Sequence, residues 1–118
     1  MRPLFHPPVE AMTVQGILYA LSDPCRLNIY VDLLQASCSQ NCSFFSQSGN
    51  VSLPKSTLSQ HFKILREAGL IYSERKGVEV KNLPRYEDLK KTAFWPMIEN
   101  IVEAYQAEAK KLKKQNRK

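Results

Sequence analysis

Residues 53–70 carry the side chains of this chain that are best suited to contacting phosphates and base edges. Their polar positions hold cations, small hydroxyls and one amide, and no acid occurs before Glu67. An ordinary solvent-facing helix mixes Glu with Lys, whereas a surface that approaches a polyanion excludes acids. Lys or Arg contacts phosphate and guanine, Gln contacts adenine, and Ser or Thr contacts either. The pattern favours recognition of duplex DNA by Lys55, Ser56, Ser59, Gln60, Lys63 and Arg66.

The same segment has the spacing of one amphipathic helix, expected over residues 55–67, followed by a small hairpin. Leu58, Phe62 and Leu65 recur at i, i+4 and i+7 and form an apolar stripe, and Gly69 is placed to end the helix. Beyond it, residues 72–81 alternate with period two around a turn expected at Lys76 and Gly77. A helix of this kind followed directly by a basic hairpin is typical of a winged helix-turn-helix.

Cys38 and Cys42 form the only closely spaced thiol pair. They could close a disulfide, hold a soft metal as thiolates, or fill space as small hydrophobes. A structural zinc site needs four ligands, so Cys25, His6 or a partner subunit would have to contribute. The pair adjoins the segment expected to support the recognition helix, which suits a thiol-directed sensor.

Three further residues have simpler expected roles. Cys25, at the start of a predicted helix, is either a thiol of lowered pKa or a small core residue, and we favour the core residue. His61 lies beside the apolar stripe, which favours a structural, hydrogen-bonded histidine over a ligand. His6 lies in the Pro-rich N-terminal arm and is uninformative unless that arm reaches a thiol.

Aromatic residues gather near the C-terminal end of the chain. Phe94, Trp95 and Tyr105 could line an organic-ligand pocket at a dimer interface, although we expect them to form the dimer core. No enzymatic constellation is present, since only four glycines occur and neither a Gly-rich phosphate loop nor a Ser–His–Asp pattern is found. We therefore expect a protein that is not an enzyme and that needs no cofactor.

The remaining elements follow from helical spacing and punctuation. We expect helices over 13–21, 24–35 and 86–94, and a last helix from about Pro96 to the end. The irregular residues 36–53 offer one short supporting helix near 44–47. The first and last helices both have broad apolar faces, which one small core cannot bury, so we expect a two-fold dimer through the terminal helices.

Charge is distributed unevenly along the 118 residues. Residues 1–109 hold 11 cations and 11 acids, whereas residues 110–118 hold six cations and no acid. Residues 55–81 carry a net charge of +3, so the positive charge of the folded part lies on the expected helix and hairpin. The chain divides into an arm (1–10), a winged domain (11–109) and a basic tail (110–118), the tail being a solvated helix end or a DNA contact.

Location follows from what the sequence lacks. No apolar run approaches the roughly 20 residues that span a bilayer, and the first residues lack the apolar core of a signal peptide. We expect a cytoplasmic protein without a membrane partner.

Three motifs together resemble the ArsR/SmtB family of bacterial winged-helix repressors. They are Ala20-Leu-Ser-Asp-Pro-Cys-Arg-Leu27, Lys55-Ser-Thr-Leu-Ser-Gln-His-Phe-Lys-Ile-Leu-Arg-Glu-Ala-Gly-Leu-Ile71 and Arg75-Lys-Gly-Val-Glu79. The resemblance covers about residues 11–105 and implies a homodimeric repressor whose operator affinity is usually lowered by a ligand, often a thiophilic metal. It implies that DNA is contacted by Lys55, Ser56, Thr57, Ser59, Gln60 and Lys63, with Arg75 and Lys76 of the wing on phosphate or the minor groove.

The chain departs from the family pattern at the metal sites. The Cys-x-Cys of the supporting helix is absent, residues 96–118 contain no His, Asp or Cys, and Cys25 replaces a common Thr. The metal, if any, is therefore left unknown, and a thiophilic metal or an oxidant at Cys38 and Cys42 is the expected effector. The alternative function is a winged helix that serves as a dimerisation or docking module without specific DNA recognition.

Overall fold

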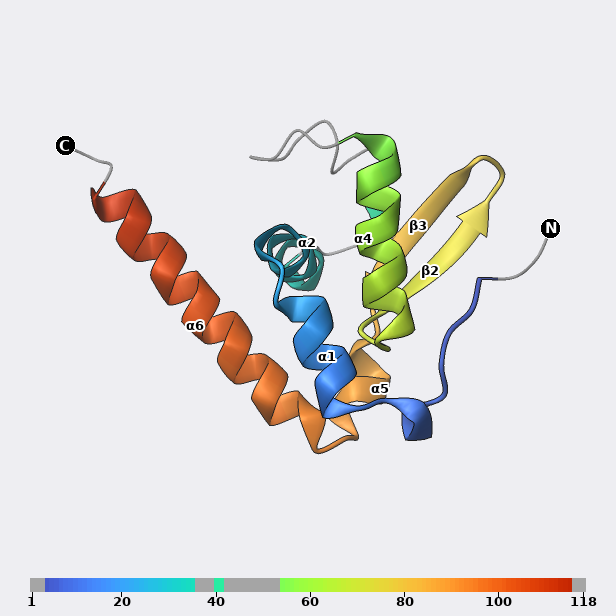
Figure 1. Ribbon diagram of the computed structural model, residues 1–118, viewed down its shortest axis with the longest axis horizontal. Helices are drawn as coiled ribbons and strands as arrows, with labels where there is room; N and C mark the ends of the chain where they lie inside the picture. Colours follow the sequence, from blue (N-terminus) through green and yellow to red (C-terminus); the bar gives the residue numbers. More distant parts are fainter. Residues whose placement is uncertain (1–3, 36–39, 42–53, 116–118) are drawn as a thin grey trace.

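The computed structural model describes residues 4–35, 40–41 and 54–115, and Figure 1 shows how their elements are arranged. Among these described residues, helices and a hairpin make up the body, and a long last helix extends from it. In chain order the elements are η1 (Val9–Ala11), α1 (Val14–Leu21), α2 (Pro24–Gln35), β1 (Gln40–Asn41), α4 (Lys55–Glu67), β2 (Ile71–Lys76), β3 (Glu79–Pro84), α5 (Tyr86–Lys90) and α6 (Phe94–Gln115).

Side-chain and backbone caps set the start of α1 and the end of α4. The Thr13 hydroxyl accepts a hydrogen bond from the Gly16 N–H (3.0 Å) at the start of α1. At the end of α4 the Leu70 N–H donates to the Leu65 carbonyl (3.1 Å) and the Gly69 N–H to the Arg66 carbonyl (3.0 Å). Gly69 has φ +90°, as this C-terminal cap requires. The prediction that Gly69 ends the helix is confirmed.

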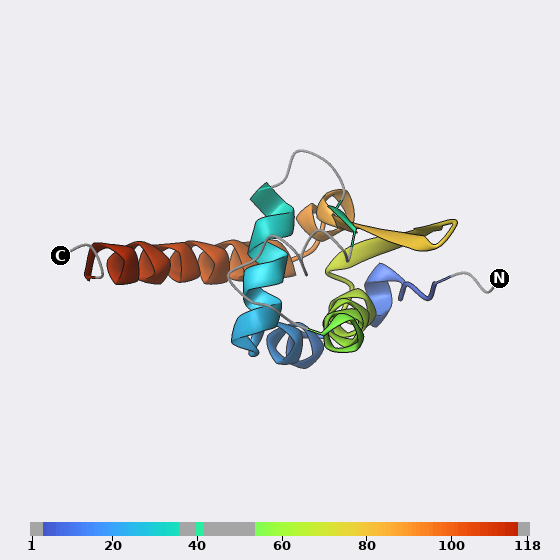
Figure 2. The same ribbon diagram turned by 90° about the horizontal axis from the view of Figure 1, so that it is seen from above.

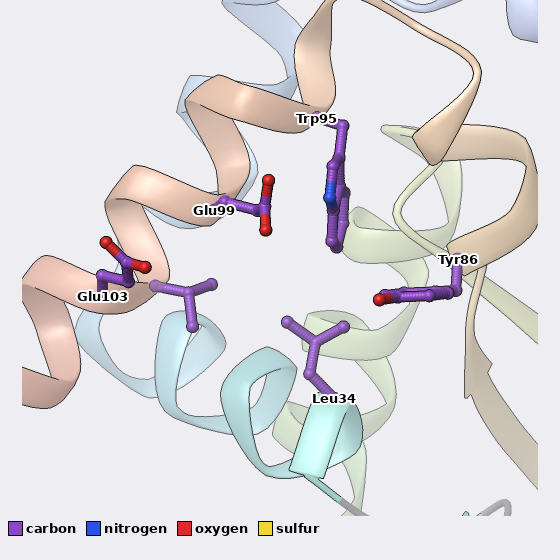
Figure 3. A pocket seen from close by; sticks show the side chains of 6 residues that line it. Leu34, Tyr86, Trp95, Glu99 and Glu103 are labelled. Carbon is purple, nitrogen blue, oxygen red and sulfur yellow. The ribbon is translucent and has the colours of Figure 1, made fainter.

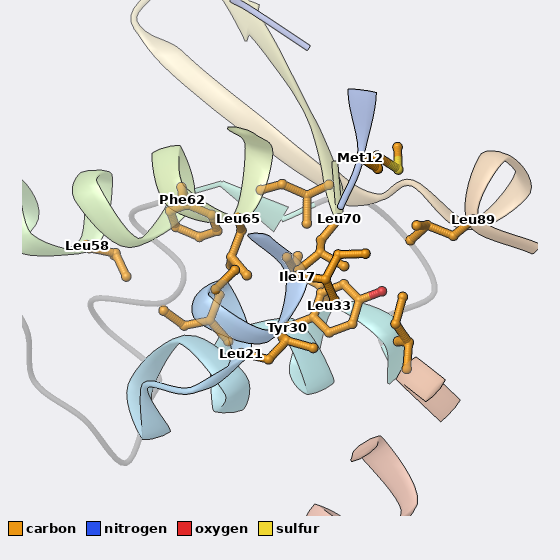
Figure 4. Packing of buried hydrophobic residues seen from close by; sticks show 14 residues of the cluster. Met12, Ile17, Leu21, Tyr30, Leu33, Leu58, Phe62, Leu65, Leu70 and Leu89 are labelled. Atoms are coloured by element: carbon orange, nitrogen blue, oxygen red, sulfur yellow. The ribbon is translucent and has the colours of Figure 1, made fainter. Parts of the chain in front are cut away.

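A single apolar cluster joins α1, α2, α4, the base of the hairpin, α5 and the start of α6 (Figure 4). Helix α2 contributes Ile29, Tyr30 and Leu33 to this cluster. The buried members of the cluster are Met12, Ile17, Ala20, Leu21, Ile29, Tyr30, Leu33, Leu58, Phe62, Leu65, Leu70, Ile71, Leu89 and Ile98. The apolar stripe of α4 therefore anchors that helix to the core.

The hairpin is longer than the expected 72–81 and belongs to a three-stranded antiparallel sheet of order β1-β3-β2. Lys76 pairs with Glu79, so the turn consists of Gly77 and Val78 and not of Lys76 and Gly77 as predicted. The reason is that Gly77, at φ +62°, takes the first central position of the two-residue turn. Strand β1, which the sequence analysis did not predict, pairs Gln40 with Asn82.

The expected helix over 86–94 was wrong at its C-terminal end. Helix α5 ends at Lys90, and α6 begins at Phe94 with Pro96 in its first turn. Thr92 explains the break, because its hydroxyl donates to the Leu89 carbonyl (2.7 Å) and accepts from the Phe94 N–H (3.2 Å). The expected helix near 44–47 lies outside the described residues.

Helix α6 extends well beyond the rest of the molecule (Figure 2). The whole molecule measures 51 × 34 × 24 Å along its principal axes. Its first turns lie on the core, where Ile98 is fully buried. Within the described residues, no helix combines the length and the apolar character needed to cross a membrane.

Candidate nucleic-acid interface

Helix α4 presents two faces of opposite character. Leu58, Phe62 and Leu65 are at most 2% exposed and lie against the core. The opposite side of the helix is open to solvent and consists of Lys55, Ser56, Thr57, Ser59, Gln60 and Lys63, all of them exposed. The first turn holds no acid, so the cations and hydrogen-bonding groups meet no competing carboxylate there.

The wing and α4 enclose one shallow hollow. Arg75 of β2 lines it together with Ser56, Ser59, Gln60 and Lys63 of α4, and its volume is about 290 Å³. The structure thus brings an exposed wing cation together with the exposed face of the helix, as the motifs predicted. Lys76 ends β2, and its side chain lies outside the described part of the structure.

A short polar chain fixes the wing relative to α4. Arg66 Nη1 donates to the Ser73 hydroxyl (3.4 Å), and that hydroxyl donates to Asn82 Oδ1 (2.7 Å). Ser73 and Asn82 are buried, and they face each other across β2 and β3. Arg66, which the sequence analysis placed on the polar face, is half-buried and serves this link. Two polar residues at paired hairpin positions were the signal that could have revealed it.

The N-terminal arm is bound to the outer edge of the wing. His6 Nε2 accepts a hydrogen bond from the Ser73 N–H (3.0 Å), and its ring packs edge-on against Tyr72. Arg85 donates to the Pro7 carbonyl (2.6 Å). Burial, and then the charges of Arg66 and Arg85, lower the pKa of His6. His6 therefore positions the arm, a role that sequence reasoning missed because the contact spans 67 residues.

Arg26, near the start of α2, joins the end of α1 to the middle of α4. It is buried, and it donates to the carbonyls of Ala20 (2.8 Å) and Tyr19 (3.2 Å) at the end of α1. Its Nη1 lies 3.5 Å from Nδ1 of His61, the half-buried histidine of α4. Burial lowers the pKa of His61, Asp23 opposes this, and Arg26 adds to the lowering. The prediction that His61 lies beside the apolar stripe is confirmed.

The three C-terminal aromatics do not share one pocket. Trp95 lines an apolar hollow of about 190 Å³ with Tyr86, Leu34 and Val102, and Glu99 and Glu103 stand at its side (Figure 3). Phe94 packs against the core instead. Tyr105 lies further along α6 and donates to Asn28 Oδ1 (2.8 Å). The thiol pair Cys38 and Cys42 lies outside the described residues.

A sequence profile described as bacterial regulatory protein, arsR family, matches residues 31–73. Among curated proteins, the HTH-type transcriptional repressor SmtB of Mycobacterium tuberculosis, from strains CDC 1551 and H37Rv, is 37% identical over 75 residues. The match covers 63% of this chain and 53% of the repressor, so the chain spans about half the length of the relatives it matches.

Solved structures share the fold. An ArsR-like transcriptional regulator from Rhodococcus sp. RHA1 superposes with a TM-score of 0.56 at 24% identity, over 86% of this chain and 91% of that one. M. tuberculosis Rv0081 superposes with a TM-score of 0.59 at 22% identity, over 92% and 97%. At these identities the superpositions establish the winged helix-turn-helix fold. The match over residues 31–73 adds that this segment, from within α2 to the middle of β2, is similar to the helix-turn-helix of the arsR family.

Proposed function

We propose that this protein is a sequence-specific DNA-binding transcriptional repressor. Helix α4 enters the major groove with Gln60 at base edges and Lys55 and Lys63 near phosphates. Arg75 and Lys76 of the wing contact the flanking backbone or the minor groove. The observation that carries this proposal is the exposed, acid-free face of α4 that shares one hollow with Arg75.

The proposed repressor acts as a homodimer. Val14, Leu18 and Tyr19 of α1 are large apolar side chains that stay exposed in the single chain. Helix α6 extends beyond the body, where its outer turns are free to meet the same helix of a second copy (Figure 2). Two-fold pairing would place two α4 helices about one duplex turn apart, roughly 34 Å, so the expected operator is palindromic.

The proposed release signal is thiol-directed and acts at Cys38 and Cys42. The support comes from the sequence, since the two thiols are four residues apart and precede the recognition helix. An oxidant or a thiophilic metal is the expected class of effector.

The first experiment is fluorescence anisotropy on the promoter DNA beside the protein's own gene, with random duplex as the competitor. We expect tight, selective binding by a species whose light-scattering mass is twice 13.5 kDa. Repeating the titration in mild oxidant tests the thiol signal, and a Cys38→Ser/Cys42→Ser variant is the control. Equal binding to both duplexes would overturn the repressor and favour the protein-interaction module.

A further inference from the structure

Three potential metal ligands meet where α2 begins beside the middle of α4. They are the Asp23 carboxylate, the Cys25 thiol and the His61 imidazole, and one ligand atom from each lies within 4.8 Å of the other two. All three residues are half-buried, so the site is formed by the fold and is still open to water. This is the one such group of three within the described residues.

The donor set suits a thiophilic divalent cation of the zinc class. Zinc binds thiolate at about 2.3 Å and imidazole at about 2.0–2.1 Å, which places neighbouring ligands of a tetrahedron roughly 3.5 Å apart. A separation of at most 4.8 Å therefore needs a contraction of at most about 1.3 Å. Three protein ligands with water in the fourth position is an established arrangement for this metal.

Each ligand has capacity for the metal besides its present contacts. Asp23 Oδ2 accepts the Arg26 N–H (3.0 Å) at the start of α2, which leaves Oδ1 for a cation. The His61 ring offers a nitrogen to the cation, and neutral imidazole is the form that binds metal. The Cys25 thiol would bind as the thiolate and release its proton to solvent.

One cation faces the site and does not block it. Arg26 Nη1 lies 3.5 Å from His61 Nδ1, which is a long contact that is readily exchanged. The guanidinium is held independently by the Ala20 and Tyr19 carbonyls. A divalent ion would also meet two anionic ligands, the carboxylate and the thiolate, which offset the charge of Arg26.

We propose that Asp23, Cys25 and His61 bind a zinc-class metal ion that joins the start of α2 to the recognition helix. His61 directly follows Gln60, so the contraction around the ion would move the DNA-facing side of α4 relative to α2. This site is separate in sequence from the Cys38–Cys42 pair. Its effect on DNA rests on the proposed repressor function, whereas metal binding itself does not.

Cobalt(II) titration of the full-length protein tests the site without DNA. We expect one Co²⁺ per chain with thiolate-to-cobalt absorption and the intense visible bands of tetrahedral coordination, displaced by Zn²⁺. Cys25→Ser should abolish the thiolate band and raise the dissociation constant at least about 100-fold. Asp23→Asn, which preserves the helix cap, and His61→Gln should each weaken binding.

The matched control is Cys38→Ser/Cys42→Ser, which should leave the cobalt spectrum unchanged. Circular dichroism and thermal unfolding of each metal-free variant verify that folding is intact. The site is overturned if wild-type protein gives no thiolate band, if Cys25→Ser binds Co²⁺ like wild type, or if the double control loses the spectrum.

Anisotropy with and without Zn²⁺ tests the coupling. We expect Zn²⁺ to lower operator affinity about 10-fold, within the usual range of coupling between sites, in wild type and in the Cys38→Ser/Cys42→Ser variant but not in Cys25→Ser. Selective DNA binding that ignores a bound metal would overturn the coupling. A cobalt spectrum in a protein without selective DNA binding would instead overturn the repressor function.

Discussion

Helices α4 and α6 are both amphipathic, yet their apolar sides are accommodated differently. The stripe of α4 is wholly inside its own domain, with Leu58, Phe62 and Leu65 buried. The first turns of α6 lie on the core, where Ile98 is buried. Further along, an open hollow of about 390 Å³ lies between α6 and α2, beside the Tyr105–Asn28 hydrogen bond. The difference indicates that α4 is positioned by its own chain, whereas the outer part of α6 is available to a partner.

The largest expected effect is a difference in unfolding free energy between a variant of α4 and a variant of α6. Phe62→Ala should cost about 3–5 kcal/mol of unfolding free energy, because it empties a fully packed position between α4 and the core. Tyr105→Phe should cost about 1 kcal/mol, since it removes the hydrogen bond to Asn28 alone. Urea unfolding of both variants measures the contrast, and equal losses would contradict it.

The end of α4 gives the next largest effect. A Cβ at Gly69 would lie 2.6 Å from Met12 Cε, at a backbone φ of +90°, so Gly69→Ala should cost about 2 kcal/mol or more. Gly77→Ala is the matched control, because its φ is +62° and nothing lies within 4 Å of the added atom. That variant should cost about 1 kcal/mol. Thermal unfolding compares them, and a more harmful Gly77→Ala would count against a tight cap.

The exposed face of α4 should contain two kinds of DNA contact. Gln60→Ala should weaken operator binding by about 1–3 kcal/mol and random-duplex binding much less. Lys63→Ala should weaken both and reduce the slope of log affinity against log salt by about one unit. Anisotropy at several salt concentrations measures both quantities. Equal losses on both duplexes would exclude Gln60 from base recognition, and an unchanged slope would exclude Lys63 from a phosphate contact.

The smallest effect concerns the N-terminal arm, whose His6 contacts the wing. Neutral His6 accepts the Ser73 N–H, and its pKa is lowered, mainly by burial. The arm contact should thus be fully present above the ordinary histidine pKa of about 6.5 and be lost as pH falls through the lowered value. NMR titration of His6 and protease sensitivity of the arm measure this. His6→Ala should remove the pH dependence, and a raised pKa would contradict it.

The sequence was sufficient for features that depend on local pattern. Helices α2 and α4 have the bounds 24–35 and 55–67 that spacing and capping residues predicted. The sequence did not reveal features that depend on contacts between residues far apart in the chain. The pairing of β1 with β3, the Arg66–Ser73–Asn82 link and the docking of His6 all join segments through the tertiary fold. The early end of α5 depends on the hydroxyl orientation of Thr92, which spacing does not reveal.

Strand β1 covers part of one side of the wing. Its residues Gln40 and Asn41 pair with Asn82 and Lys81 of β3. Where β1 pairs, β3 is the central strand of the sheet and not an edge. Because an open edge strand is a template for pairing with another chain, β1 blocks such pairing at this part of the wing.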